Sequence, residues 1–60
     1  MERMGTPAEV AETLKVSTKT LAQWRWQGRG PAWSKIGSTV RYAWTDVEAY
    51  RTANRVQPRA

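Results

Sequence analysis

The sequence contains no cysteine and no histidine. The absence of cysteine excludes disulfides and thiol chemistry, and the absence of both residue types removes the usual ligands of structural zinc. Histidine is also the commonest general base near neutral pH. Because the chain lacks a glycine-rich phosphate loop as well, we predict that it is not an enzyme and that it needs no metal, cofactor or small-molecule substrate.

Long apolar runs are missing too. No segment approaches the roughly 20 residues that cross a bilayer, and residues 1–5 lack the apolar block of a secretory signal. We therefore expect a soluble, cytoplasmic protein without a membrane partner. A chain of 60 residues suffices for one small domain with a marginal core, so a single domain over residues 1–60 is expected.

Acidic residues are absent from the middle of the chain. Residues 1–12 and 46–60 contain them, but residues 13–45 contain none. Such a one-signed block is an electrostatic footprint for a polyanion, with scattered solvated charges as the alternative. Glycine and proline interrupt the block, which argues against a membrane-surface helix. Its basic residues are Lys15, Lys19, Arg25, Arg29, Lys35 and Arg41.

A capping pattern marks the start of a first helix. Thr6 can accept a hydrogen bond from the free amides, proline suits the first helical position, and Glu9 completes a capping box. The apolar spacing that follows predicts a short amphipathic helix over residues 7–15. Its inward residues are Val10, Ala11 and Leu14.

A second helix is predicted over residues 18–27, with Ser17 as its N-cap and Gly28 as its left-handed stop. The tight turn before it, with Val16 directed inward, is typical of a helix-turn-helix, although a plain pair of antiparallel helices has the same elements. On a helical wheel, Leu21 and Trp24 share the buried side.

The opposite side of this second helix has the residues expected to face DNA. Lysine and glutamine can bond to base edges in a major groove, and hydroxyls near the helix start can reach phosphate. Trp26 lies at the centre of this side, with folding back onto a hairpin as an equal alternative. The expected DNA contacts from this segment are Ser17, Thr18, Lys19, Thr20, Gln23, Arg25 and Trp26.

Residues 34–43 alternate well enough to form a β-hairpin, with Gly37-Ser38 as its turn. We expect Ile36, Val40 and Tyr42 to face the helices. The preferred interpretation is a wing that lies along the DNA backbone and reaches a minor groove, with a purely structural flap as the alternative. The expected wing contacts, on the other face or at the tip, are Lys35, Ser38, Thr39 and Arg41.

Thr45-Asp46-Val47-Glu48 repeats the capping-box pattern and predicts a third helix over residues 46–55, with Val47 and Tyr50 buried. Trp24 is expected in the core, and Trp33 and Trp44 are expected to clamp the hairpin onto the helices. The expected fold is mainly α with a small β-hairpin: a winged helix-turn-helix of order α-α-β-β-α.

The segments TPAEVAETLKVSTKTLAQW and KIGSTVRYAWTDVEAY resemble the winged helix-turn-helix of phage excisionases, also called recombination directionality factors, and of MerR-like and AlpA-like DNA-binding modules. The resemblance covers about residues 6–50. It implies a noncatalytic accessory protein that binds double-stranded DNA in the arms of phage attachment sites and bends it. It also implies cooperative self-association on DNA and a phage integrase as partner, with excision favoured over integration.

The same resemblance places major-groove contacts at Lys19, Gln23 and Trp26, where other members often have arginine, and minor-groove contacts at the wing. Arg51, Arg55 and the tail of residues 57–60 lie outside this DNA face and are candidates for contact with the integrase. The arginine- and alanine-rich composition is typical of a phage of a GC-rich host such as a mycobacterium, so the protein is expected on DNA in a bacterial cell.

Two alternatives to an excisionase remain open. A small MerR-like or AlpA-like transcriptional regulator has the same fold but needs a dimer element. The chain ends soon after the third helix, which favours the excisionase. An enzyme or an antitoxin-like interaction module is the other alternative, although nothing in the sequence resembles a catalytic constellation.

Overall fold

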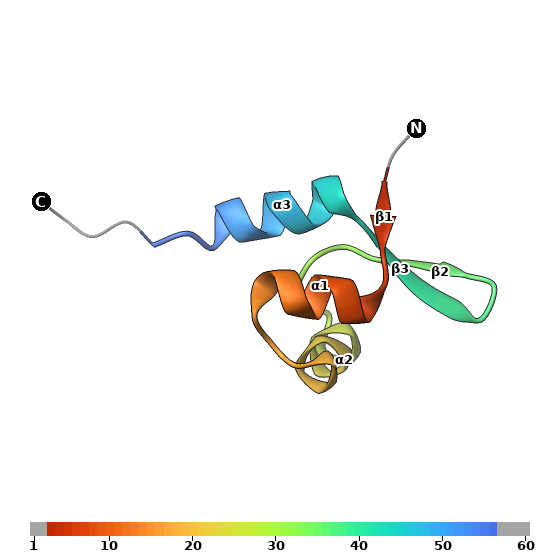
Figure 1. Ribbon diagram of the computed structural model, residues 1–60. Helices are drawn as coiled ribbons and strands as arrows, with labels where there is room; N and C mark the ends of the chain where they lie inside the picture. Colours follow the sequence, from red (N-terminus) through yellow and green to blue (C-terminus); the bar gives the residue numbers. More distant parts are fainter. Residues whose placement is uncertain (1–2, 57–60) are drawn as a thin grey trace, which may run out of the picture.

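The computed structural model describes residues 3–56, so the tail of residues 57–60 lies outside the described part. Over residues 3–56 the fold is a winged helix-turn-helix with three helices and three strands, one strand more than predicted. The β2–β3 hairpin and α3 project in opposite directions from the other helices (Figure 1). The elements are β1 (Met4–Gly5), α1 (Pro7–Leu14), α2 (Thr18–Gln27), β2 (Ser34–Ile36), β3 (Thr39–Ala43) and α3 (Trp44–Ala53).

The capping box of α1 is complete. The amide of Glu9 donates to Thr6 Oγ1 at 3.2 Å, and the amide of Thr6 donates to Glu9 Oε1 at 2.9 Å. Both amides would otherwise lack a partner at the start of the helix. The helix ends at Leu14 rather than at residue 15, because Lys15 adopts the left-handed conformation, with φ 60° and ψ 41°, as its C-cap.

Both caps of α2 are formed as well. Ser17 Oγ accepts from the amide of Thr20 at 3.0 Å. Gly28 ends the helix at φ 71°, a conformation that glycine adopts readily because it has no Cβ. In the turn before α2, the amide of Val16 donates to the Ala11 carbonyl at 3.0 Å. This short turn holds α2 against α1.

The core lies where α1, α2, β3 and α3 meet. Trp24 and Tyr50, both expected to be buried, are half-buried and pack at the edge of this core. Their ring centres are 5.7 Å apart, and the ring planes are tilted by 48°. A chain of this length cannot enclose every large aromatic ring. The buried core residues are Val10, Ala11, Leu21, Tyr42 and Val47.

The predicted start of α3 is wrong by two residues. The helix begins at Trp44 and ends at Ala53 instead of spanning 46–55. Its N-cap is Ala43, which makes no side-chain cap hydrogen bond, so Thr45 lies inside the helix rather than capping it. The Thr-x-x-Glu pattern predicted Thr45 as the N-cap of this helix, whereas the structure places the N-cap at Ala43.

The reason for this early start is the unpredicted strand β1. It pairs antiparallel with the end of β3, and beyond this pairing the amide of Trp44 donates to the Arg3 carbonyl at 3.0 Å. A backbone oxygen thus satisfies the first amide of α3, so β3 runs directly into the helix. The contact is close: a Cβ on Gly5 would lie 2.5 Å from the Trp44 ring.

The predicted orientation of the hairpin residues is partly wrong. Ile36 pairs with Thr39 and Lys35 pairs with Val40, and directly opposed residues on antiparallel strands share a face of the sheet. Ile36 therefore lies on the face of Thr39 and Arg41 and is 51% exposed, while Lys35 lies on the face of Val40. The two-residue turn sets this register, which alternation along a single strand does not reveal.

Candidate nucleic-acid interface

The outward side of α2 carries polar and aromatic side chains. Leu21 is completely buried, while Lys19, Gln23 and Trp26 on the opposite side are exposed. Trp26 is 90% exposed, so the alternative in which it folds back onto the hairpin is wrong. This side offers a cation, an amide and an apolar ring to a ligand. We define these three residues as the outward face of α2.

The start of α2 is suited to an anion. Ser17 Oγ and Thr20 Oγ1 are 2.9 Å apart and hydrogen-bonded to each other. Thr20 is half-buried, whereas Ser17, Thr18 and Lys19 are exposed. The amides at a helix N-terminus and the positive end of its dipole favour a phosphate at this position. The exposed residues are thus better placed for phosphate contact than Thr20.

Arg25, predicted to contact DNA, is turned toward the wing. Its Nη1 donates to Tyr42 Oη at 2.8 Å, and its Cζ lies 6.0 Å from the centre of the Trp33 ring. A hydrogen bond from a charged donor contributes about 1.5–3 kcal/mol, and an exposed cation–π contact about 0.5–1 kcal/mol. Arg25 therefore fixes the position of the wing relative to α2.

Sequence reasoning missed this role of Arg25, although a signal was present. Arg25 follows the buried Leu21 by four residues, and residues at that spacing lie on the same side of a helix. Trp33 was expected to clamp the hairpin, but it is 42% exposed and its ring lies against Arg25. The Arg25 guanidinium thus links the wing to α2, while Trp44, the other predicted clamp residue, is half-buried and packs against the core.

The predicted contact residues of the wing differ in their surroundings. Thr39 Oγ1 donates to the Ile36 carbonyl at 2.7 Å and thereby closes the turn. Arg41 is half-buried, and its Nη1 donates to the carbonyl of the preceding residue at 2.7 Å. Lys35 and Ser38 are exposed, so these two side chains are accessible without any rearrangement of the wing.

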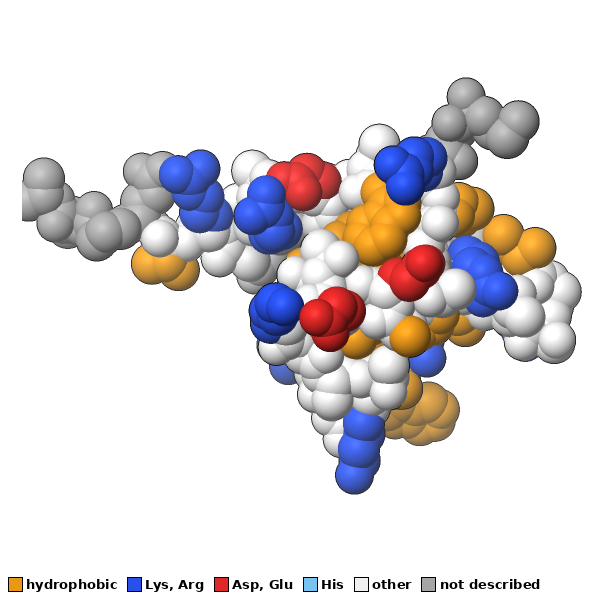
Figure 2. Space-filling model, viewed as in Figure 1, with side chains coloured by type: hydrophobic (Ala, Val, Ile, Leu, Met, Phe, Trp, Pro, Cys, Tyr) orange, Lys and Arg blue, Asp and Glu red, His pale blue; other side chains and the backbone are white. Residues whose placement is uncertain are grey.

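Charge is unevenly distributed along the chain. Acidic side chains lie over α1 and α3 in Figure 2, and the segment from α2 to the end of β3 contains none. Every charged residue in that segment is basic, so this region attracts a polyanion. We call this segment, residues 18–43, the basic region. Its charged residues are Lys19, Arg25, Arg29, Lys35 and Arg41.

One acid of α1 and one acid of α3 form ion pairs with neighbouring basic residues. Lys15 Nζ lies 3.3 Å from Glu12 Oε1, and Arg51 forms a second i,i+3 ion pair with Glu48. The hydrogen bond from Arg51 lowers the pKa of Glu48, and the same contact raises the pKa of Arg51. Among residues 3–56, both ion pairs lie outside the basic region.

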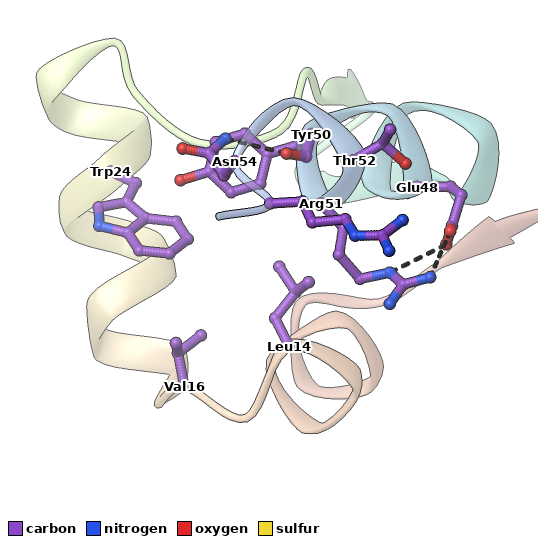
Figure 3. A pocket seen from close by; sticks show the side chains of 9 residues that line it. Leu14, Val16, Trp24, Glu48, Tyr50, Arg51, Thr52 and Asn54 are labelled. Carbon is purple, nitrogen blue, oxygen red and sulfur yellow. Dashed lines mark hydrogen bonds and ion pairs between the residues drawn. The ribbon is translucent and has the colours of Figure 1, made fainter. Parts of the chain in front are cut away.

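A groove of about 470 Å³ separates α3 from the turn between α1 and α2. Leu14, Val16 and Trp24 point into it, opposite residues of α3 (Figure 3). Arg51 and Arg55, the predicted protein contacts, line its α3 side. Trp24 belongs to the inward side of α2, so the groove is separate from the outward face of that helix.

No helix within residues 3–56 is long and apolar enough to cross a membrane. The same part of the chain contains no cluster of acidic residues that could hold a metal ion.

The comparison with known proteins agrees with this geometry. No curated protein matches the chain. Residues 6–55 match the helix-turn-helix domain, a family that includes excisionase-like and AlpA-type small DNA-binding proteins. The match runs from the capping residue of α1 to just beyond α3, and the family indicates DNA binding. The chain therefore belongs to the helix-turn-helix domain family.

Proposed function

We propose that this protein is a DNA-binding and DNA-bending accessory factor that directs a phage integrase toward prophage excision and away from integration. One observation carries the DNA-binding part of the proposal: the basic region contains five cations and no acid. A DNA duplex is a dense polyanion, and phosphate contacts dominate the affinity of the proteins that bind it. Membership of a family with excisionase-like proteins supports the role in excision.

In the proposed complex, α2 enters the major groove. Its outward face meets base edges, where lysine and glutamine side chains can bond directly. The wing follows the backbone and places Arg41 at the adjacent minor groove, whose negative potential attracts arginine. Arg25 acts mainly by holding the wing against α2. The proposed phosphate and groove contacts are Ser17, Thr18, Lys19, Thr20, Gln23, Arg25, Trp26, Lys35, Ser38, Thr39 and Arg41.

Bending and cooperative self-association complete the proposal. The outward face of α2 has three side chains for base recognition, which is too few for high specificity by direct contact alone. DNA shape and neighbouring copies on tandem sites would supply the remainder. The groove beside α3 supports a separate protein contact, because Arg51 and Arg55 line it away from the outward face of α2. We propose this groove as the contact with the integrase.

Recombination in vitro tests this function. Purified phage integrase and DNA with the attachment sites are incubated with and without the protein, and both excision and integration are measured. The expected result is stimulated excision and inhibited integration. Lys19→Glu reverses a charge on the outward face of α2 and should abolish both effects. Lys15→Glu, at the C-cap of α1, is the matched control and should retain both effects.

Two outcomes would contradict the proposal. If the protein binds the attachment-site DNA but changes neither reaction, the excision role is wrong and a transcriptional regulator is favoured. If it binds no double-stranded DNA at all, the assignment of the basic region is wrong.

A further inference from the structure

Trp26 is far more exposed than folding alone would favour. At 90% exposure, the Trp26 side chain is the most exposed large hydrophobic group within residues 3–56. Burying an aromatic ring of this size is a major source of stability in a small domain. Trp26 therefore contributes little to the stability of the free protein. An exposed ring of this size is typical of a residue that contacts a ligand.

The neighbours of Trp26 define the chemistry of that ligand. Ala22 lies one turn before it and is also exposed, so a methyl group and an indole ring adjoin on α2. Gln23 lies beside them on the same side of the helix. Across the whole basic region no acidic side chain is present. The surface is thus an apolar patch on a segment whose charged side chains are all basic.

A DNA major groove contains one apolar group that fits such a patch. Base edges there present hydrogen-bond donors and acceptors, and the C5-methyl group of thymine is the exception. The indole ring has a single donor, Nε1–H, and no acceptor, so most of its surface can make only apolar contacts. We propose that Trp26, with Ala22 beside it, contacts thymine methyl groups and thereby makes the protein select thymine at those positions.

Gln23 fits the same target. A glutamine amide can form two hydrogen bonds with the N6 and N7 atoms of adenine, so adjacent contacts to adenine and thymine select A·T base pairs. This inference rests on the proposed function, because it needs α2 to lie in a major groove. It adds the chemical feature of the DNA that the outward face of α2 recognises.

Replacement of thymine by uracil tests the inference. The preferred duplex is first selected by the protein from a randomised pool of short duplexes. It is then synthesised with thymidine and, separately, with deoxyuridine at every thymidine position, which removes the methyl groups and leaves the hydrogen-bonding edges intact. The wild-type protein should bind the uracil duplex about fourfold more weakly per contacted methyl group, which corresponds to about 0.8 kcal/mol.

Two variants make the test specific. Trp26→Ala should bind the thymine duplex more weakly and lose the difference between the two duplexes. Because the side chain is exposed, this variant should fold normally, as a circular dichroism spectrum can check. Gln23→Ala is the matched control on the same side of α2; it should bind more weakly but keep the wild-type ratio of thymine to uracil affinities.

Failure of the inference is distinguishable from failure of the proposed function. If no duplex is selected from the pool, DNA binding itself is wrong. If a duplex is selected and the wild type binds both forms equally, only the methyl contact is wrong. A difference that persists unchanged in Trp26→Ala would also overturn the inference, because the methyl groups would then act through DNA shape or through another side chain.

Discussion

α3, and α1 together with its C-cap Lys15, carry both acidic and basic side chains, whereas α2 and the wing carry basic ones alone. On the first side, Glu12 pairs with Lys15 and Glu48 pairs with Arg51. On the second side, Arg25 donates to a tyrosine hydroxyl and Arg41 donates to a backbone carbonyl. A bond to a neutral acceptor fixes a guanidinium without cancelling its charge. Arg25 and Arg41 are therefore both held in place and still charged, as residues that bind a polyanion must be.

The largest expected effect is a loss of stability, and it should differ between the inward and outward sides of α2. Leu21→Ala removes a completely buried side chain and should lower the free energy of unfolding by about 3 kcal/mol. Domains of this size are rarely more stable than about 3–5 kcal/mol, so the variant should retain at most about 2 kcal/mol and unfold at a much lower urea concentration than the wild type. Urea denaturation measures the change. Trp26→Ala on the opposite side should change stability by less than about 0.5 kcal/mol; equal losses would contradict the division of the helix.

Arg41→Ala tests the wing against α3. If Arg41 enters a minor groove, the variant should bind DNA about 1–3 kcal/mol more weakly, measured by fluorescence anisotropy with a labelled duplex. Arg51→Ala removes an arginine from the side that carries the ion pairs and should leave DNA affinity unchanged. An unaltered affinity for Arg41→Ala would show that the wing is only a structural flap.

Tyr42→Phe tests the connection between α2 and the wing. It removes the acceptor of the Arg25 hydrogen bond and should lower the free energy of unfolding by about 1.5–3 kcal/mol, the range for a bond from a charged donor. It should weaken DNA binding as well, because the wing is then held less firmly. Tyr50→Phe, at the edge of the core beside Trp24, is the control, and we expect little change in either measurement. DNA affinity that survives Tyr42→Phe would show that the wing needs no such anchor.

The salt dependence of DNA binding distinguishes Lys35 of the wing, which forms no ion pair within residues 3–56, from Lys15, which is paired with Glu12. If about five phosphates are contacted, a plot of log affinity against log salt concentration should have a slope of about −4 to −5. Lys35→Ala should reduce the magnitude of this slope by about 1. Lys15→Ala, which removes a lysine already paired with Glu12, should not alter it. Equal slopes for both variants would contradict the assignment of Lys35, and a slope near zero for the wild type would contradict nucleic-acid binding.

The smallest effect is expected from the ion pair of α3. The hydrogen bond from Arg51 lowers the pKa of Glu48 in the folded state, so the pair stabilises the fold above the unfolded pKa of about 4.3. This contribution is lost as the pH falls through the folded pKa. Because both side chains are exposed, the effect is small. Glu48→Gln should lower the melting temperature slightly near neutral pH and not at all in strong acid; a larger difference in acid would contradict the sign.

Two Thr-x-x-Glu segments show how far sequence reasoning reaches. Thr6 and Glu9 form the predicted capping box, in which the side chain of each residue accepts a hydrogen bond from the backbone amide of the other. The segment that begins at Thr45 has the same pattern, yet α3 starts at Trp44 because the Arg3 carbonyl accepts its amide. β1 has two residues, too few for any periodicity in the sequence. No sequence pattern therefore predicts β1, which is defined only by its pairing with β3.

The candidate site likewise has features that local sequence predicts and one that it does not. The exposed positions of Lys19, Gln23 and Trp26 follow from helical geometry, which relates residues at most one or two turns apart. The inward turn of Arg25 depends on Tyr42, seventeen residues away in the sequence, and was missed. The contacts of the predicted site residues with DNA stay predictions that the experiments above address.

The sequence by itself determined the caps of α1 and α2, the location of the hairpin and the absence of acid from the middle of the chain. These features depend on residues close to one another, so local patterns suffice to predict them. Only the tertiary structure decided the start of α3, the face on which Ile36 lies and the use of Arg25 as the link between α2 and the wing. Each of these depends on strand pairing or on a side-chain bond between different elements, and no local pattern specifies which partner a residue will meet.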